Sequence, residues 1–141
     1  MAVVVDCSIW MKWLFEDEAT PATAKLLESL RDDSLVVPGL WLHEVASVLL
    51  VAERRGRISA NDADEFVRML RTLSLEIDYA GFDRAIRVSS QLARDHALTA
   101  YDATYLELAD RMQLPLATLD VALAKAGKAL GLVVLPSMVN P

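Results

Sequence analysis

Apolar residues in this chain form short continuous runs separated by longer stretches with helical patterning. The runs predict strands at residues 2–5, 35–37, 75–77, 116–118 and 132–135. Helical spacing and capping signals predict helices at residues 8–15, 21–30, 40–55, 60–73, 82–97, 100–112 and 121–130. Strands that are apolar at consecutive positions are typical of a parallel sheet covered on both faces.

Strands that alternate with helices indicate an α/β fold, and we expect a three-layer α/β/α sandwich with a largely parallel central sheet. The chain has 141 residues, and no repeat or linker divides it. This length is enough to bury one hydrophobic core, so we expect a single domain over residues 1–141. In sheets of this kind, ligands bind outside the carboxyl ends of the strands.

Two acidic residues directly follow predicted strands. Asp6 comes after the apolar run at residues 2–5, and Asp120 comes after the run that begins at Leu116. Both are therefore expected at the edge of the sheet where active sites are built. An acid that only ends a strand is the less favoured interpretation for Asp6, because burying an unpaired carboxylate is costly.

Two further acids, Glu44 and Asp102, lie near the starts of helices on their apolar faces. On a helix, residues at i, i+4 and i+7 share one face. Asp102 shares its face with Leu106 and Ala109, whereas Glu107 lies on the other side. Helices that follow parallel strands begin at the carboxyl ends of those strands. All four carboxylates are thus expected to converge.

Helix capping is an alternative explanation for these acids. Asp102 stands three residues after Thr99, as in a capping box, and Asp120 precedes a predicted helix. Glu44 would complement its helix dipole. Each explanation holds for one acid at a time, whereas a shared functional site explains why four acids fall on one edge.

Converged carboxylates need cations or protons. Two unit charges about 4 Å apart repel by roughly 4 kcal/mol at an effective dielectric constant near 20. Oxygen ligands without Cys or His partners suit Mg²⁺ or Mn²⁺, one ion or two. Such ions assist the hydrolysis of phosphodiester bonds. We therefore expect Asp6, Glu44, Asp102 and Asp120 to form the catalytic metal site of a nuclease.

Composition limits the other possibilities. The net charge of −6 argues against a generic phosphate-backbone binder. A lone cysteine, Cys7, forms no internal disulfide and is expected to be buried and inert. The N-terminus does not resemble a signal peptide, and no segment is long and apolar enough for a membrane span. We expect a cytoplasmic protein without membrane contact.

The acidic residues lie in segments that resemble the PIN-domain ribonucleases, above all the VapC-type toxins of bacterial toxin–antitoxin pairs. These segments are VVDCS at residues 4–8, PGLWLHEV at 38–45, LTAYDATYLELA at 98–109 and ATLD at 117–120. The likeness extends over essentially the whole chain. One departure is Ser47, where many relatives carry Asn, so no role is carried over to this residue.

The resemblance implies several further properties. The four acids would bind one or two metal ions, and Ser8 and Thr118 would be supporting hydroxyl groups. The substrate would be RNA, the protein would be a homodimer, and a cognate antitoxin would bind and inhibit it. The RNA target, the cleavage site and the antitoxin do not follow from the sequence.

The predicted helix at residues 8–15 is apolar nearly all round, so part of it is expected to face another chain or a groove. The resemblance favours an antitoxin contact with Trp10, Trp13 and Phe15 as anchors. The alternative is a helix buried within the domain.

The densest basic cluster consists of Arg54, Arg55 and Arg57. One interpretation is a solvated helix end, where positive charges complement the helix dipole. The other interpretation is that these residues guide RNA to the active site.

Other protein classes fit less well. A phosphatase of the haloacid dehalogenase type is also acidic and Mg²⁺-dependent, but it needs a second Asp where Ser8 stands. A response-regulator receiver needs paired acids after its first strand and a late Lys at a strand end, and neither is found. A non-catalytic PIN-fold binding module remains as the second alternative, which the full set of four acids disfavours.

Overall fold

The computed structural model describes residues 1–137, and its centre is a parallel sheet. The strands are β1 (Ala2–Val5), β2 (Ser34–Pro38), β3 (Leu75–Asp78), β4 (Leu116–Ala117) and β5 (Val134–Leu135). They lie in the order β3-β2-β1-β4-β5, and each neighbouring pair is parallel. The predicted parallel sheet is confirmed, with β1 at its centre.

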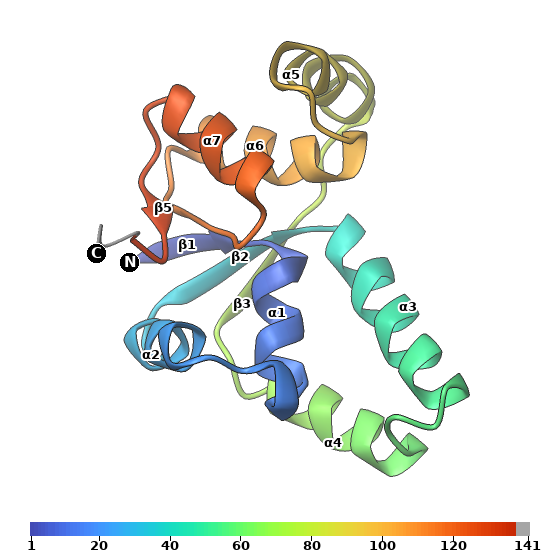
Figure 1. Ribbon diagram of the computed structural model, residues 1–141. Helices are drawn as coiled ribbons and strands as arrows, with labels where there is room; N and C mark the ends of the chain where they lie inside the picture. Colours follow the sequence, from blue (N-terminus) through green and yellow to red (C-terminus); the bar gives the residue numbers. More distant parts are fainter. Residues whose placement is uncertain (138–141) are drawn as a thin grey trace.

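Helices lie on both sides of the sheet (Figure 1). One side carries α1 (Cys7–Leu14), α2 (Pro21–Ser29), α3 (Leu40–Arg54) and α4 (Ala60–Leu70), with a short 3₁₀ turn at Glu16–Glu18 between α1 and α2. The other side carries α5 (Ser89–His96), α6 (Ala100–Met112) and α7 (Val121–Ala129). This arrangement confirms the predicted three-layer α/β/α sandwich.

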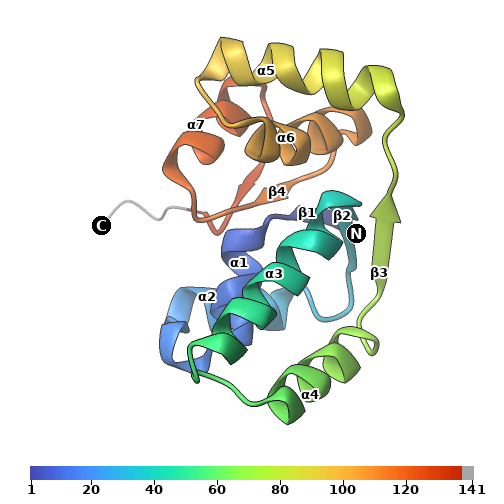
Figure 2. The same cartoon turned by 90° about the vertical axis from the view of Figure 1, so that its right-hand side faces the viewer.

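Helix α5 does not cover the sheet. It packs on the outer side of α6, as Figure 2 shows, and it continues a π-helical segment at Arg84–Val88. Because only one side of this segment meets α6, the large apolar side chains of Phe82, Ile86 and Val88 remain exposed. The sequence predicts one helix at residues 82–97, and the structure is helical without a break from residue 82 to residue 96, with the π-helical segment inside it.

Helix starts follow the capping signals of the sequence. Thr20 caps α2, with Pro21 as the first helical residue. At the start of α4, the Asp62 amide donates to Ser59 Oγ at 3.1 Å and the Ser59 amide donates to Asp62 Oδ2 at 2.9 Å. These two bonds complete a reciprocal capping box.

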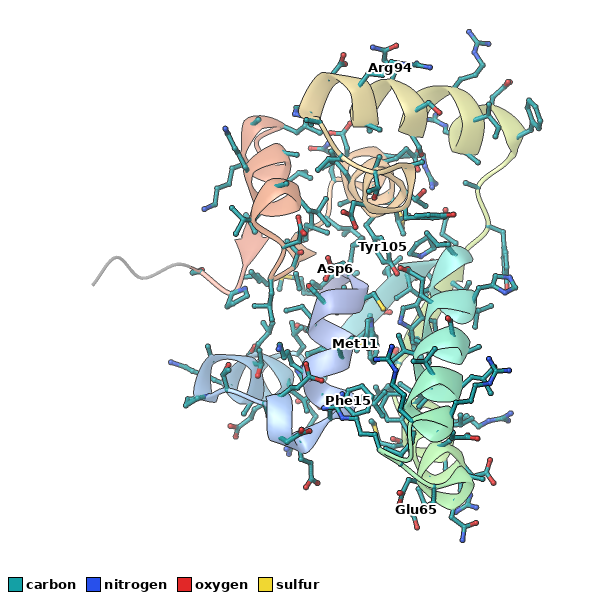
Figure 3. All side chains as sticks on the ribbon, turned by 45° about the vertical axis from the view of Figure 1, so that its right-hand side comes forward. Asp6, Met11, Phe15, Glu65, Arg94 and Tyr105 are labelled. Carbon is teal, nitrogen blue, oxygen red and sulfur yellow. The ribbon has the colours of Figure 1, made fainter. Side chains whose placement is uncertain are left out.

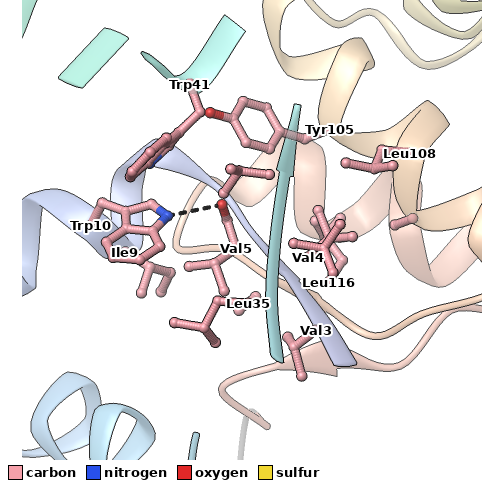
Figure 4. Close-up of a cluster of buried hydrophobic side chains, with 14 of the residues drawn as sticks. Val3, Val4, Val5, Ile9, Trp10, Leu35, Trp41, Tyr105, Leu108 and Leu116 are labelled. Atoms are coloured by element: carbon pink, nitrogen blue, oxygen red, sulfur yellow. Dashed lines mark hydrogen bonds between the residues drawn. The ribbon is translucent and has the colours of Figure 1, made fainter. Parts of the chain in front are cut away.

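Helix α1 is a core element. Trp10 has no exposed surface, its Nε1 donates to the Val5 carbonyl oxygen at 3.1 Å (Figure 4), and its ring packs against Trp13 and Trp41. Phe15 is 6% exposed. These two residues are therefore corrected from antitoxin anchors to core residues, because side chains packed inside the domain offer no surface to a partner. Their burial also explains why the helix is apolar nearly all round.

The basic cluster at the end of α3 is partly structural. The Arg57 guanidinium lies 3.7 Å from the centre of the Phe15 ring, and Arg57 also pairs with Asp17 and Glu18. Arg54 and Arg55 remain exposed. The charge of Arg57 is thus already balanced by acids of its own chain.

Among residues 1–137, no helix combines the length and the apolar character that crossing a membrane requires.

Candidate active site

Asp6 lies where β1 ends, and four donors hold its carboxylate. As the N-cap of α1, its Oδ1 accepts bonds from the Ser8 amide at 3.0 Å, the Ser8 hydroxyl at 2.5 Å and the Ile9 amide at 3.4 Å. Its Oδ2 accepts a bond from the Thr118 hydroxyl at 2.6 Å. Asp6 is only 4% exposed, so its carboxylate is held in one orientation at the carboxyl ends of β1 and β4 (Figure 3).

Ser8 and Thr118 connect this carboxylate to the loop after β4. The Leu119 amide donates to Ser8 Oγ at 2.9 Å, and the Asp120 amide donates to Thr118 Oγ1 at 3.0 Å. Each hydroxyl therefore donates to Asp6 and accepts from this loop. The two residues named by the resemblance as supporting hydroxyls are placed to orient Asp6 relative to Asp120.

Glu44 comes from the second turn of α3 and is fixed by Tyr105 of α6. The Tyr105 hydroxyl donates to Glu44 Oε1 at 2.6 Å. Sequence reasoning assigned no role to Tyr105. Its position three residues after Asp102 places both on one side of α6, and this spacing is the signal that could have identified it.

Asp102 and Asp120 both lie at helix starts, as the capping alternative proposed. The Asp120 Oδ1 accepts a bond from the Leu123 amide at 2.8 Å, so Asp120 does cap α7. The Asp102 amide donates to the Thr99 hydroxyl at 3.1 Å. The return bond of a full capping box, from the Thr99 amide to the Asp102 carboxylate, is not formed in this part of the structure. Capping thus accounts for Asp120 and leaves the Asp102 carboxylate without this function.

The electrostatics link the four acids. Burial raises the pKa of Asp6, and the charge of Asp102 raises it further. Burial also raises the pKa of Glu44, with additional repulsion from Asp6 and Asp102. Burial and the charge of Asp120 raise the pKa of Asp102. Each carboxylate is therefore within electrostatic reach of at least one other.

None of these four acids forms an ion pair with a basic side chain of residues 1–137. Glu107 shows the opposite case. It is 3% exposed, and it pairs with Arg111 at 2.8 Å and with Arg84 at 3.5 Å. This buried carboxylate, away from the sheet edge, is thus neutralised by the chain itself. The acids at the sheet edge have no such basic partner in residues 1–137.

Hard divalent cations match this donor set, because all of its ligand atoms are oxygens and its charge is unbalanced. As the side chains stand in residues 1–137, no three acids, His or Cys residues have the spacing of a formed metal site. Binding of an ion by several of these carboxylates would therefore require side chains to rotate. Asp6 is held by four hydrogen bonds, so it would be the least free to move.

Cys7 lies beside these acids without taking part as a nucleophile. Its thiol is partly buried. Burial, together with the charges of Glu44 and Asp6, raises the pKa of Cys7 to about 12. The thiol is therefore protonated at neutral pH, and a thiolate is the nucleophilic form of cysteine.

Two cavities flank the acids. One, of about 410 Å³, lies beside Glu44, and its lining includes His43, Ser47 and Tyr101. The other, of about 310 Å³, lies beside Asp120 at the carboxyl ends of β4 and β5. A long, narrow substrate that crosses the acids would have room on both sides.

Comparison with known proteins identifies the class. The PIN domain family matches residues 3–129, so the chain belongs to the PIN-domain family. The match covers all four acids, Ser8, Thr118 and Tyr105.

Individual relatives agree with this assignment. Ribonuclease VapC3 of Pyrobaculum aerophilum is 27% identical over 130 residues, covering 92% of this chain and 98% of that protein. PAE2754 from the same organism has a similar structure, with a TM-score of 0.69 and 22% identity over 95% of this chain and 83% of that chain. A toxin–antitoxin complex from Klebsiella pneumoniae contains a chain with a TM-score of 0.56 and 19% identity, covering 84% of this chain and 86% of that one. The last two similarities concern the fold.

Proposed function

We propose that this protein is a Mg²⁺- or Mn²⁺-dependent endoribonuclease and the toxin of a toxin–antitoxin pair. The observation that carries the proposal is the edge of the sheet, where Asp6, Glu44, Asp102 and Asp120 lie without a basic partner in residues 1–137. Membership of the PIN-domain family and the similarity to a ribonuclease support RNA as the substrate.

The four carboxylates would hold the metal, and they differ in the groups that position them. Ser8 and Thr118 fix Asp6, and Tyr105 directs one oxygen of Glu44. Asp102 and Asp120 close the site from the starts of α6 and α7. When bound, such an ion activates water and neutralises the charge that develops on a phosphodiester.

The test is cleavage of single-stranded and structured RNA with Mg²⁺ or Mn²⁺, comparing wild type with Asp6→Asn. Asp62→Asn is the matched control, since Asp62 is an exposed acid that caps α4. We expect Asp6→Asn to abolish cleavage and Asp62→Asn to retain it. Cleavage by Asp6→Asn at the wild-type rate, or by wild type in EDTA, would contradict the proposal.

The two alternatives give other results in the same assay. A non-catalytic binding module would retain RNA without cutting it, with or without divalent ions. An acidic-pocket phosphatase would release inorganic phosphate from monoesters such as p-nitrophenyl phosphate while leaving internal RNA bonds intact. The departure at Ser8 from the second Asp of such phosphatases disfavours this outcome, because Ser8 holds Asp6 instead.

For the antitoxin, we propose the apolar groove between α3 and α4. It has a volume of about 470 Å³, and the exposed side chains of Leu42, Leu50 and Val67 lie in its lining or rim. An apolar groove between two helices suits an amphipathic helix of a partner. Leu50→Lys should weaken binding of the cognate antitoxin and leave RNA cleavage intact. Unchanged antitoxin binding would exclude the groove.

We also propose that the protein forms a homodimer through a surface distinct from the groove between α3 and α4. Phe82, Ile86 and Val88 expose apolar side chains along the π-helical segment and its start. If these residues form the dimer contact, Ile86→Glu will shift the sedimentation coefficient from dimer to monomer. An unchanged coefficient would exclude this surface.

A further inference from the structure

The cavity beside Asp120 is continuous with the acidic edge. Its lining includes Thr118 and Asp120, which belong to the candidate active site. It opens at the carboxyl ends of β4 and β5, where Pro136 follows the last strand. A ligand in this cavity is therefore a direct neighbour of any substrate at the carboxylates.

The charge of this region is opposite to that of the chain as a whole. The protein carries a net charge of −6, yet residues 121–137 contain no Asp or Glu and include Lys125 and Lys128. Both lysines are exposed, both line the cavity, and neither forms an ion pair within residues 1–137. The other two lysines of the chain, Lys12 and Lys25, lie on α1 and α2.

The rest of the lining is apolar. Leu119, Val121 and Val134 line the cavity, and Val121 is 83% exposed. Val121, Lys125 and Lys128 follow the helical spacing i, i+4 and i+7, so they share one face of α7. The cavity thus combines two cationic side chains with apolar ones. Lysines bind phosphates as point charges, and apolar side chains pack against the face of a base.

We propose that this cavity binds a nucleotide of the RNA next to the cleaved phosphodiester, with Lys125 and Lys128 on the phosphates that flank it. The proposal rests on the proposed function. It also explains how an acidic protein attracts RNA: the repulsion of phosphates by the acidic edge is offset by a local positive surface, since charges beyond about 10 Å are screened at ordinary ionic strength.

The first test compares the steady-state cleavage kinetics of wild type, Lys125→Ala, Lys128→Ala, the double variant and the control Lys25→Ala. We expect KM of the double variant to rise roughly tenfold with kcat little changed, because the lysines bind RNA without touching the reacting atoms. The dependence of log(kcat/KM) on log[salt] should become shallower by about 1.4, since a single-strand phosphate contact contributes about 0.7. Lys25→Ala should behave as wild type.

A second pair of variants tests the same surface without removing a lysine. Val121→Lys should lower KM and Val121→Asp should raise it, and the exposure of Val121 leaves the core intact in both. Equal KM values and salt slopes in all lysine and Val121 variants would overturn the proposed subsite. If wild type neither binds nor cleaves RNA, the proposed function fails instead, so the two failures are distinguishable.

Discussion

Two helices of this protein begin with the same sequence signal, a hydroxyl residue followed three positions later by an Asp. The pKa of the Asp is nevertheless shifted in opposite directions in the two helices. Helix α4 begins after Ser59 with Asp62 at its third position, and α6 begins after Thr99 with Asp102 at its third position. Asp62 is exposed and accepts the bond from the Ser59 amide, which lowers its pKa. Asp102 forms no such bond with the Thr99 amide, and burial with the charge of Asp120 raises its pKa.

A capping motif therefore does not determine the function of its acid. The first turn of α4 faces solvent, so its carboxylate is free to complete the cap. The first turn of α6 lies at the carboxyl ends of the strands, near Asp6 and Asp120. There the carboxylate belongs to a group of like charges, and its role is decided by segments distant in sequence.

The largest expected difference is in RNA cleavage, between the variants Asp102→Asn and Asp62→Asn. Asp102→Asn should lower kcat/KM for RNA cleavage by at least about a hundredfold, because it removes a negative oxygen from the metal site. Asp62→Asn should leave kcat/KM within about twofold. Initial rates at saturating Mn²⁺ measure both, and equal rates for the two variants would show that Asp102 has no part in the site.

Divalent ions should also stabilise Asp62→Asn and Asp102→Asn to different extents. A ligand that binds only the folded state at a hundred times its Kd stabilises by about 2.7 kcal/mol. Mg²⁺ or Mn²⁺ should therefore raise the Tm of wild type and of Asp62→Asn, and much less that of Asp102→Asn. A Tm increase of the same size in all three, measured by calorimetry against EDTA, would place the ion elsewhere.

In the metal-free protein the two acids should respond to pH with opposite signs. A raised pKa in the folded state means that the contribution of Asp102 to stability is present below its ordinary value of 3.8 and is lost as pH rises through the raised value. For Asp62 the contribution is present above 3.8 and is lost as pH falls through the lowered value.

Urea unfolding of the metal-free protein across pH measures this contrast. Relative to Asp102→Asn, wild type should lose stability as pH rises from 4 to 7. Relative to Asp62→Asn, it should lose stability as pH falls below 4. Parallel pH profiles for all three proteins would mean that the two carboxylates have the same environment.

The smallest contrast concerns the hydroxyl caps themselves. Ser59→Ala and Thr99→Ala should each lower the free energy of unfolding by about 1 kcal/mol, since each removes one bond to a helix amide. Because both hydroxyls have this local function, the two losses should be similar in urea titrations. A much larger loss for Thr99→Ala would show that its hydroxyl also supports the acidic edge.

Much of the fold follows from local sequence. The run at residues 2–5 is a buried central strand, Pro21 opens α2, and the Ser59 motif opens α4, as the sequence predicts. Asp6 and Asp120 were found because each follows a strand. These features depend on residues within one or two turns, so they can be recognised without knowledge of the rest of the chain.

Other features were not predictable from local sequence. Glu107 was expected on the side of α6 away from the apolar face, but it is buried and pairs with Arg84 and Arg111. Tyr105 reaches Glu44, which lies 61 positions earlier in the sequence. Both contacts join segments that the chain brings together only on folding.

Local sequence specifies the order of strands and helices and marks the four acids at strand and helix ends, because apolar periodicity and capping act over a few residues. Which side chains are buried and which charges are balanced depends on the folded chain, in which Trp10 and Phe15 lie in the core and Glu107 pairs with two arginines. The same fold leaves Asp6 and Asp102 without a basic partner in residues 1–137. The physical reason is that burial and electrostatic energy depend on distance in space, which local pattern does not specify.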